Sequence, residues 1–166
     1  MNNIILIGMP GVGKSTVGVV LAKNLGYHFI DSDLVIQQKY GKLLHEIISE
    51  QGLDGFLRIE DQVNASIETD KSIIATGGSA VFGQAAMRHF KEIGTVVYLK
   101  LKYEEIENRL GDLKQRGVAM HEGETLRDVF ESRIPLYEKY ADITIDCEGK
   151  QIREIVSQMK QLKINK

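Results

Sequence analysis

Apolar residues follow two patterns that alternate along the chain. Short continuous apolar runs that end in glycine, serine or aspartate are typical of strands buried in a parallel sheet. Segments with an apolar residue at every third or fourth position are typical of helices with one buried face. The runs predict strands at residues 4–7, 28–30, 72–76, 95–101 and 142–146. The periodic segments predict helices at about residues 17–25, 34–40, 43–50, 56–68, 84–91, 103–110, 126–140 and 151–162.

The alternation of strands and helices predicts an α/β fold, in which helices cover both faces of a parallel sheet. The length of 166 residues is enough for one domain with a full core and too short for two ordinary ones, so we expect one domain over residues 1–166. Ligands of such sheets bind beyond the carboxyl ends of the strands. Three unusual stretches, GMPGVGKS, DSD and TGGS, follow predicted strands. We therefore expect them to converge in one site.

The first of these stretches is a phosphate-binding motif. Gly8, Gly13, Lys14 and Ser15 match G-x-x-x-x-G-K-[ST] between a predicted strand and a predicted helix. Glycines let successive backbone N–H groups wrap around phosphate oxygens, the lysine supplies a positive charge, and the serine hydroxyl can bind Mg²⁺. The alternative is a glycine-rich turn without a ligand, but the order of strand, loop and helix favours a nucleotide site. Its expected phosphate-contacting residues are Gly11, Val12, Gly13, Lys14, Ser15 and Thr16.

Two aspartates follow the second predicted strand. Asp31 and Asp33 are two positions apart on an extended segment, so their side chains point to the same side. One carboxylate could hold the water shell of Mg²⁺ while the other accepts a proton from a substrate hydroxyl. The alternative for either is capping of the helix that begins near Leu34. Because no apolar strand ends in a metal-binding aspartate elsewhere, we expect Ser15 and Asp31 to serve the metal.

Glycines and two inward-facing charges add to the candidate site. Gly77 and Gly78 would let the backbone approach a ligand closely, although a simple strand-to-helix turn is an alternative. Arg133 shares a helical stripe with apolar residues, and so does Glu60. A buried arginine needs an anionic partner. That partner could be Glu60, in a structural ion pair, or the carboxylate of a substrate.

A polar, glycine-punctuated segment at about residues 111–124 is a candidate lid. Arg109 and Arg116 lie at its start, and basic residues that close over phosphates would stabilise the transferred group and exclude water. The alternative is an ordinary solvated loop.

Composition limits the class of partner. The chain has 43% hydrophobic and 27% charged residues and a net charge of −2, so no general basic surface predicts nucleic-acid binding. No apolar run is long enough to span a membrane, and no secretory leader is recognisable, which leads us to expect a cytoplasmic location and no membrane partner. Cys147 is the sole cysteine, which fits a reducing compartment. The four histidines show no spacing typical of zinc ligands.

With these residues in hand, the chain resembles the shikimate kinase family of P-loop proteins. The resemblance covers nearly the whole chain: GMPGVGKSTVG, FIDSDLVI, the glycine-to-glutamate segment at 55–60, ATGGSAV, VVYL, Arg116 and SRIPLYEKYAD. It implies a three-layer P-loop kinase fold with strand order 2-3-1-4-5. It also implies a substrate-binding helical segment at about residues 33–61 and a lid at about 111–124.

The resemblance implies ATP as phosphate donor, Mg²⁺ as cofactor, and shikimate as the small-molecule acceptor for a monomeric enzyme. Transfer would go to the 3-hydroxyl of shikimate. By position, Asp33 would bind the acceptor hydroxyls and act as base, and Asp31 would hold the Mg²⁺ water shell. Lys14 and Arg116 would stabilise the transferred phosphoryl group, with Arg109 also near the nucleotide. Residues implied for acceptor binding are Asp33, Arg58, Gly77, Gly78, Ser79 and Arg133.

Three departures from the family pattern concern the acceptor. Leu57 stands where the family's F-R-x-x-E has its substrate-binding arginine, and Arg58 is one helical step away, about 100° around the axis. Ser79 stands at the third glycine of GGG, and the lid lacks R-P-L-L. The alternatives are therefore a related kinase with another hydroxylated acceptor and a nucleotide-binding regulator without transfer. A GTPase switch is disfavoured because the chain has no N-K-x-D segment.

Overall fold

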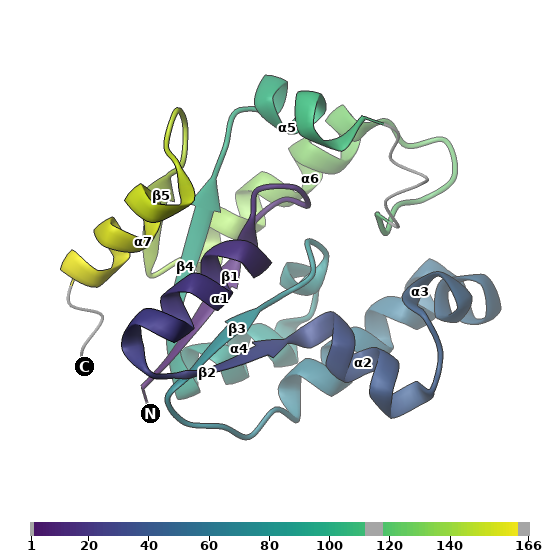
Figure 1. Cartoon of the computed structure of the whole chain (residues 1–166). Coiled ribbons are helices and arrows are strands. Elements are labelled where there is room, and N and C mark those ends of the chain that lie inside the picture. Colours follow the sequence, from purple (N-terminus) through teal and green to yellow (C-terminus); the bar gives the residue numbers. More distant parts are fainter. Residues whose placement is uncertain (1, 112–117, 163–166) are drawn as a thin grey trace.

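The computed structural model of the protein describes residues 2–111 and 118–162. Within these residues, parallel strands form one sheet in the order β2-β3-β1-β4-β5. The strands are β1 (Asn3–Ile7), β2 (His28–Asp31), β3 (Ser72–Ala75), β4 (Gly94–Lys100) and β5 (Ile143–Asp146). Both the parallel sheet and the order 2-3-1-4-5 are confirmed (Figure 1).

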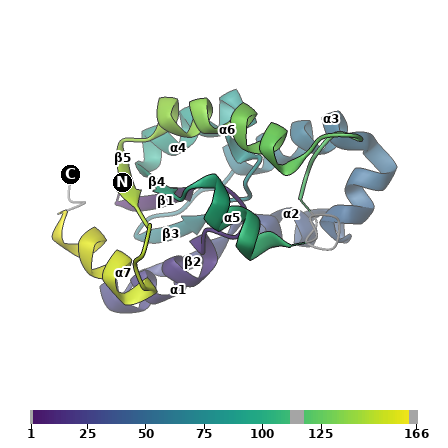
Figure 2. The same ribbon diagram turned by 90° about the horizontal axis from the view of Figure 1, so that it is seen from above.

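Helices cover both faces of the sheet. Figure 2 shows α1 (Lys14–Leu25) and α7 (Ile152–Gln161) on one face, and α4 (Gln84–Ile93) and α6 (Leu126–Tyr140) on the other. A short 3-10 helix, η1 (Ala80–Phe82), precedes α4 and was not predicted. The helix α5 (Tyr103–Leu110) lies beyond the carboxyl end of β4 (Figure 1). The predicted layers are therefore present.

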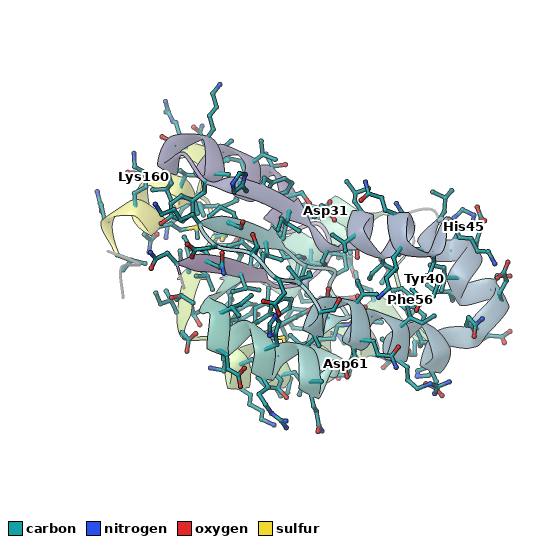
Figure 3. All side chains as sticks on the ribbon, turned by 90° about the horizontal axis from the view of Figure 1, so that it is seen from below. Asp31, Tyr40, His45, Phe56, Asp61 and Lys160 are labelled. Atoms are coloured by element: carbon teal, nitrogen blue, oxygen red, sulfur yellow. The ribbon has the colours of Figure 1, made fainter. Side chains whose placement is uncertain are left out.

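Two helices extend to one side of the sheet beyond β2. They are α2 (Ser32–Tyr40) and α3 (Leu44–Ala65), and they enclose a small apolar cluster of their own. Phe56, which is 2% exposed, belongs to this cluster and lies between the two helices (Figure 3). The helices predicted at 43–50 and 56–68 correspond to the two helical parts of α3, which are separated by a kink at the non-helical Gly52, where φ is 73° and ψ is 171°. This second cluster forms a wall beside the sheet that is separate from the main core.

The main core lies between the sheet and its helical layers. Residues Ile4–Ile7 of β1 are at most 3% exposed, as the continuous apolar run predicted. The helix α1 begins at Lys14, three residues before the apolar periodicity starts, because its first turn faces the carboxyl end of the sheet rather than the core. No helix in the described part of the chain is long and apolar enough to cross a membrane.

Candidate active site

The three unusual stretches converge on one cavity, as expected. It has a volume of about 310 Å³ at the carboxyl ends of the strands, and its walls come from the loop after β1, α2, α3, the loop after β3, and α6. Most of the predicted site residues line it: Gly11, Gly13, Lys14, Ser15, Thr16, Asp33, Gly77, Gly78, Ser79 and Arg133. Residues that are up to 123 positions apart in the sequence, such as Pro10 and Arg133, thus share one chamber.

The phosphate-binding loop holds its lysine against its own backbone. Gly11 and Gly13 have φ values of 82° and 99°, which side-chain-bearing residues rarely adopt. The Nζ atom of Lys14 donates to the carbonyls of Gly8 at 2.7 Å and Met9 at 2.9 Å. Burial lowers the pKa of this ammonium to about 7, against the opposing charge of Asp33. A phosphate group would favour the charged form, so the loop is suited to an anionic ligand.

Asp31 and Asp33 have different surroundings at the start of α2. Oδ1 of Asp31 accepts from the backbone N–H groups of Asp33 at 3.0 Å and Leu34 at 3.4 Å, so Asp31 caps the helix. Asp33 projects into the cavity, and burial followed by the charge of Asp31 raises its pKa to about 6. The capping alternative therefore holds for Asp31, whereas the carboxylate of Asp33 is free to face a ligand. A metal role for Asp31 stays a prediction.

The two glycines after β3 let three charged side chains approach the backbone. A Cβ atom on Gly77 would lie 2.8 Å from Oδ1 of Asp33 and 3.1 Å from Oε2 of Glu60. A Cβ atom on Gly78 would lie 2.8 Å from Nη1 of Arg133 and would also meet the loop after β1. A side chain at either position would therefore clash with these neighbouring atoms. That the backbone of Gly77 and Gly78 approaches a ligand closely stays a prediction.

Arg133 and Glu60 are buried but do not pair. They are 3% and 2% exposed, which confirms that both face inward. Oε1 of Glu60 accepts from the hydroxyl of Ser79 at 2.7 Å, and Arg133 donates to the carbonyl of Ala119. Among the described residues, neither side chain forms an ion pair within 4 Å. The structural Glu60–Arg133 pair is therefore wrong, because each group finds a nearer neutral partner.

Burial also perturbs Glu60. It raises the pKa of this carboxyl to about 7, although the hydrogen bond from Ser79 acts in the opposite direction. The second oxygen, Oε2, is buried and has no hydrogen-bond partner within the described residues. The cavity thus contains two carboxyls, Asp33 and Glu60, that hold protons more tightly than usual.

Four of the predicted residues lie elsewhere. Arg58 is exposed on α3 and does not line the cavity, because the helix turns it away from the wall that contains Phe56 and Glu60. Val12 is buried beside the cavity rather than in its lining. Arg109 donates to the loop carbonyls of Gly11 at 3.3 Å and Val12 at 3.4 Å. Asp31 caps the N-terminus of α2 and is not among the residues that line the cavity.

Arg116 lies outside the described residues, so its predicted role is neither supported nor contradicted. Glu60, an inward-facing charge of the sequence analysis, lines the cavity, and further lining residues were not individually predicted: Pro10, Leu44, Ile48, Phe56, Thr76, Val118 and Ala119. The apolar members on α3 have the same spacing as core residues, and periodicity alone does not distinguish a core face from a cavity wall.

The donor set suits a nucleotide with Mg²⁺. Mg²⁺ prefers oxygen ligands and keeps several waters, binding through one or two protein groups and the phosphates of its substrate. The exposed hydroxyl of Ser15 lines the cavity on the same side as Lys14, and the carboxylates of Asp31 and Asp33 lie close by. Among the described residues, no three histidine, cysteine, aspartate or glutamate side chains form a group that could hold a metal ion. The site therefore fits a metal that arrives with phosphates rather than one held by the protein alone.

Comparison with known proteins identifies the family. A family model for shikimate kinase matches residues 10–163. The chain is 36% identical over 162 residues to a shikimate kinase of Thermodesulfovibrio yellowstonii, covering 96% of this chain and 93% of the relative. It is 35% identical over 166 residues to a Bacillus anthracis shikimate kinase, covering 99% of each.

Solved structures agree. The shikimate kinase of Acinetobacter baumannii in complex with shikimate superimposes with a TM-score of 0.87 at 34% identity, covering 98% of this chain and 92% of that one. The enzyme of Aquifex aeolicus gives a TM-score of 0.83 at 31% identity, covering 96% and 94%. This protein therefore belongs to the shikimate kinase family, whose members are phosphotransferases that act on a hydroxyl acceptor.

Proposed function

We propose that this protein transfers the γ-phosphate of ATP to the 3-hydroxyl of shikimate, with Mg²⁺ as cofactor. One observation carries the proposal: a single cavity contains the phosphate-binding loop with Lys14 and, facing it, Asp33 and Arg133. A donor and an acceptor held in one chamber react as if in a unimolecular step, which is the main contribution of a kinase to catalysis. The solved relative from Acinetobacter baumannii, a complex with shikimate, supports this acceptor.

The nucleotide end of the cavity would bind and neutralise phosphate. Backbone N–H groups of residues 11–16 would surround the phosphate oxygens, and the N-terminus of α1 points at the same anion. Lys14 would leave its carbonyl partners for a phosphate oxygen, and Ser15 would ligate the metal. Bound Mg²⁺ supplies charge neutralisation on the β- and γ-phosphates. Arg109, which already contacts the loop, and Arg116 would add positive charge.

The acceptor end would orient the hydroxyl and the carboxylate of shikimate. Asp33 would accept the hydroxyl proton as phosphoryl transfer proceeds, and its pKa of about 6 lies near the pH at which a general base works well. Gly77, Gly78 and Ser79 would contact the ring through their backbone. Arg133, which among the described residues pairs with a carbonyl rather than a carboxylate, would bind the acceptor carboxylate.

A second candidate is transfer to another small hydroxylated acceptor. The observation that favours it is at Leu57, where the family pattern has a substrate-binding arginine: this leucine lines an adjoining apolar cavity, while Arg58 is exposed. The acceptor carboxylate would then have one arginine rather than two.

Coupled ATP turnover with Mg²⁺, with and without shikimate, tests the proposal. Shikimate-dependent turnover with a KM below about 1 mM, inside the ordinary enzyme range, would support it, and Asp33→Asn should abolish the turnover. ATP binding without shikimate turnover would contradict shikimate as acceptor. A panel of other hydroxylated acids would then distinguish a different acceptor from a regulator that transfers nothing.

The proposal includes the state in which the enzyme works. We expect a monomer in the cytoplasm, with a helical acceptor segment at residues 33–61 and a lid at 111–124. Cys147 is a buried free thiol, which is compatible with a reducing compartment. Light scattering coupled to gel filtration measures the mass in solution, and a mass near twice the 18.6 kDa of the chain would contradict the monomer.

A further inference from the structure

A second cavity adjoins the acceptor end of the first. Its volume is about 250 Å³, and its walls come from α3, η1, the segment before α6, and α6 itself. Leu53, Leu57, Phe82 and Val129 give it an apolar lining. The side chain of Phe82 is 40% exposed, which is unusual for a large aromatic group and places apolar surface at the cavity.

The two cavities share part of their walls. Ser79, Ala119 and Arg133 line both, so Arg133 stands at the boundary between a polar chamber and an apolar one. Its guanidinium carbon lies 5.7 Å from the centre of the Phe82 ring. Because Arg133 is 3% exposed and no described carboxylate lies within 4 Å, its charge is buried without a described counter-ion. Such a charge favours an anionic ligand.

The size and lining of the second cavity indicate which apolar group the anionic ligand could contain. An apolar cavity of about 150 Å³ in a protein is enough to bind benzene. At about 250 Å³, this cavity has room for a six-membered aromatic ring with a short arm. Aromatic rings also pack favourably against a phenylalanine such as Phe82.

We propose that this cavity binds an aromatic monocarboxylate, with the carboxylate on Arg133 and the ring among Leu53, Leu57 and Phe82. Glu124, which also lines the cavity, accepts from the backbone N–H of His121. Because Arg133 accommodates one carboxylate at a time, the ligand competes with the acceptor while leaving the phosphate-binding loop free. This competition rests on the proposed function, whereas binding of the aromatic acid does not.

Isothermal titration calorimetry of the full chain with 3-phenylpropanoate tests the inference. We expect a Kd below about 1 mM. The neutral isostere 3-phenylpropanamide is the ligand control, and it should bind at least about tenfold more weakly because it lacks the charge-assisted hydrogen bond to Arg133. Equal binding of acid and amide would overturn the role of Arg133.

A cavity-filling variant tests the location. Leu53→Trp places an indole in the cavity, and since the chain contains no tryptophan, a blue-shifted emission would report that the indole is buried. The matched control is Leu43→Trp, at a position that is 50% exposed and lines neither cavity. With a buried indole, the Kd for 3-phenylpropanoate should rise at least about tenfold, and in the control it should stay unchanged. Unchanged binding in Leu53→Trp would overturn the proposed location.

Shikimate turnover measured on the same preparation separates the two hypotheses. If the aromatic acid binds as expected and shikimate is not phosphorylated, the proposed function fails and the inference stands. If shikimate is phosphorylated and the aromatic acid does not bind, the inference is overturned and the proposed function stands. If both bind, shikimate should raise the apparent Kd of 3-phenylpropanoate, and independent binding would overturn the shared use of Arg133.

Discussion

Replacement of Glu60 by glutamine should stabilise the protein in a pH-dependent way. The side chain is 2% exposed, one oxygen accepts from Ser79, and burial raises its pKa from 4.5 to about 7. Because the folded state holds this proton more tightly than the unfolded state, the stability from the carboxyl is complete below pH 4.5. It is lost as the pH rises through about 7. The shift corresponds to a loss of about 3 kcal/mol at high pH.

Glutamine removes this titration while keeping an oxygen that can accept from Ser79. Relative to the wild type, Glu60→Gln should therefore gain about 2 to 3 kcal/mol in free energy of unfolding between pH 5 and pH 8. For a domain of this size, that gain corresponds to a relative increase in Tm of roughly 5 to 10 °C. Urea and thermal unfolding at both pH values measure it, with Glu46→Gln, an exposed position on the same helix, as control.

The test depends on how the difference in free energy of unfolding between Glu60→Gln and the wild type changes with pH. The sign of this difference at one pH does not decide it. A difference between Glu60→Gln and the wild type that is the same at pH 5 and pH 8 would refute the reasoning, because it would show that burial does not raise the pKa of Glu60. A pH-dependent gain of the same size in Glu46→Gln would refute it too, because the effect would then come from net charge.

Other predictions concern the acceptor site and the packing behind it. Leu57→Arg should lower the KM for shikimate by about 10- to 100-fold through a second charge-assisted contact, and unchanged or lower kcat/KM would contradict the idea that this position limits binding. Gly78→Ala places a Cβ atom 2.8 Å from Nη1 of Arg133, so steady-state kinetics should show a loss in kcat/KM on the order of 100-fold. In a pH profile, kcat/KM should fall below about pH 6, as Asp33 becomes protonated. Asp61 accepts from a backbone N–H at the start of α4 (Figure 3), and Asp61→Ala should cost about 1 kcal/mol in urea unfolding.

The order and type of the elements could be predicted from local pattern. The continuous apolar run at residues 4–7 and the periodic stripes of the helices each depend on residues close in sequence, and the structure confirms them. The kink at Gly52 follows the same local logic: the sequence predicted two helices separated near the glycines, and α3 consists of two helical parts on either side of this non-helical residue.

The sequence predicts that the side chains of Glu60 and Arg133 face inward, but it does not predict which groups they contact. Periodicity places Glu60 and Arg133 inward, since each lies on an apolar stripe of its own helix. The partner of each depends on segments without periodicity: Ser79 follows β3, and Ala119 lies in the irregular stretch before α6. No local signal fixes such contacts, so two facing charges suggested an ion pair that the fold does not form. The same limit applies to Arg58, where one helical step decides between the cavity and solvent.

The departures from the family pattern have one physical consequence in common. Leu57 is less polar than the arginine of the family pattern, and it lines the second cavity together with Ala119 of the segment before α6. Ser79, the third departure, donates to Oε1 of the buried Glu60, whose Oε2 has no hydrogen-bond partner among the described residues. The phosphate-binding loop keeps every residue of its motif, so the departures lie at the proposed acceptor end of the site. Arg133 lies buried between the polar and the apolar chamber, and we expect the carboxylate that it binds to determine which chamber the rest of that ligand occupies.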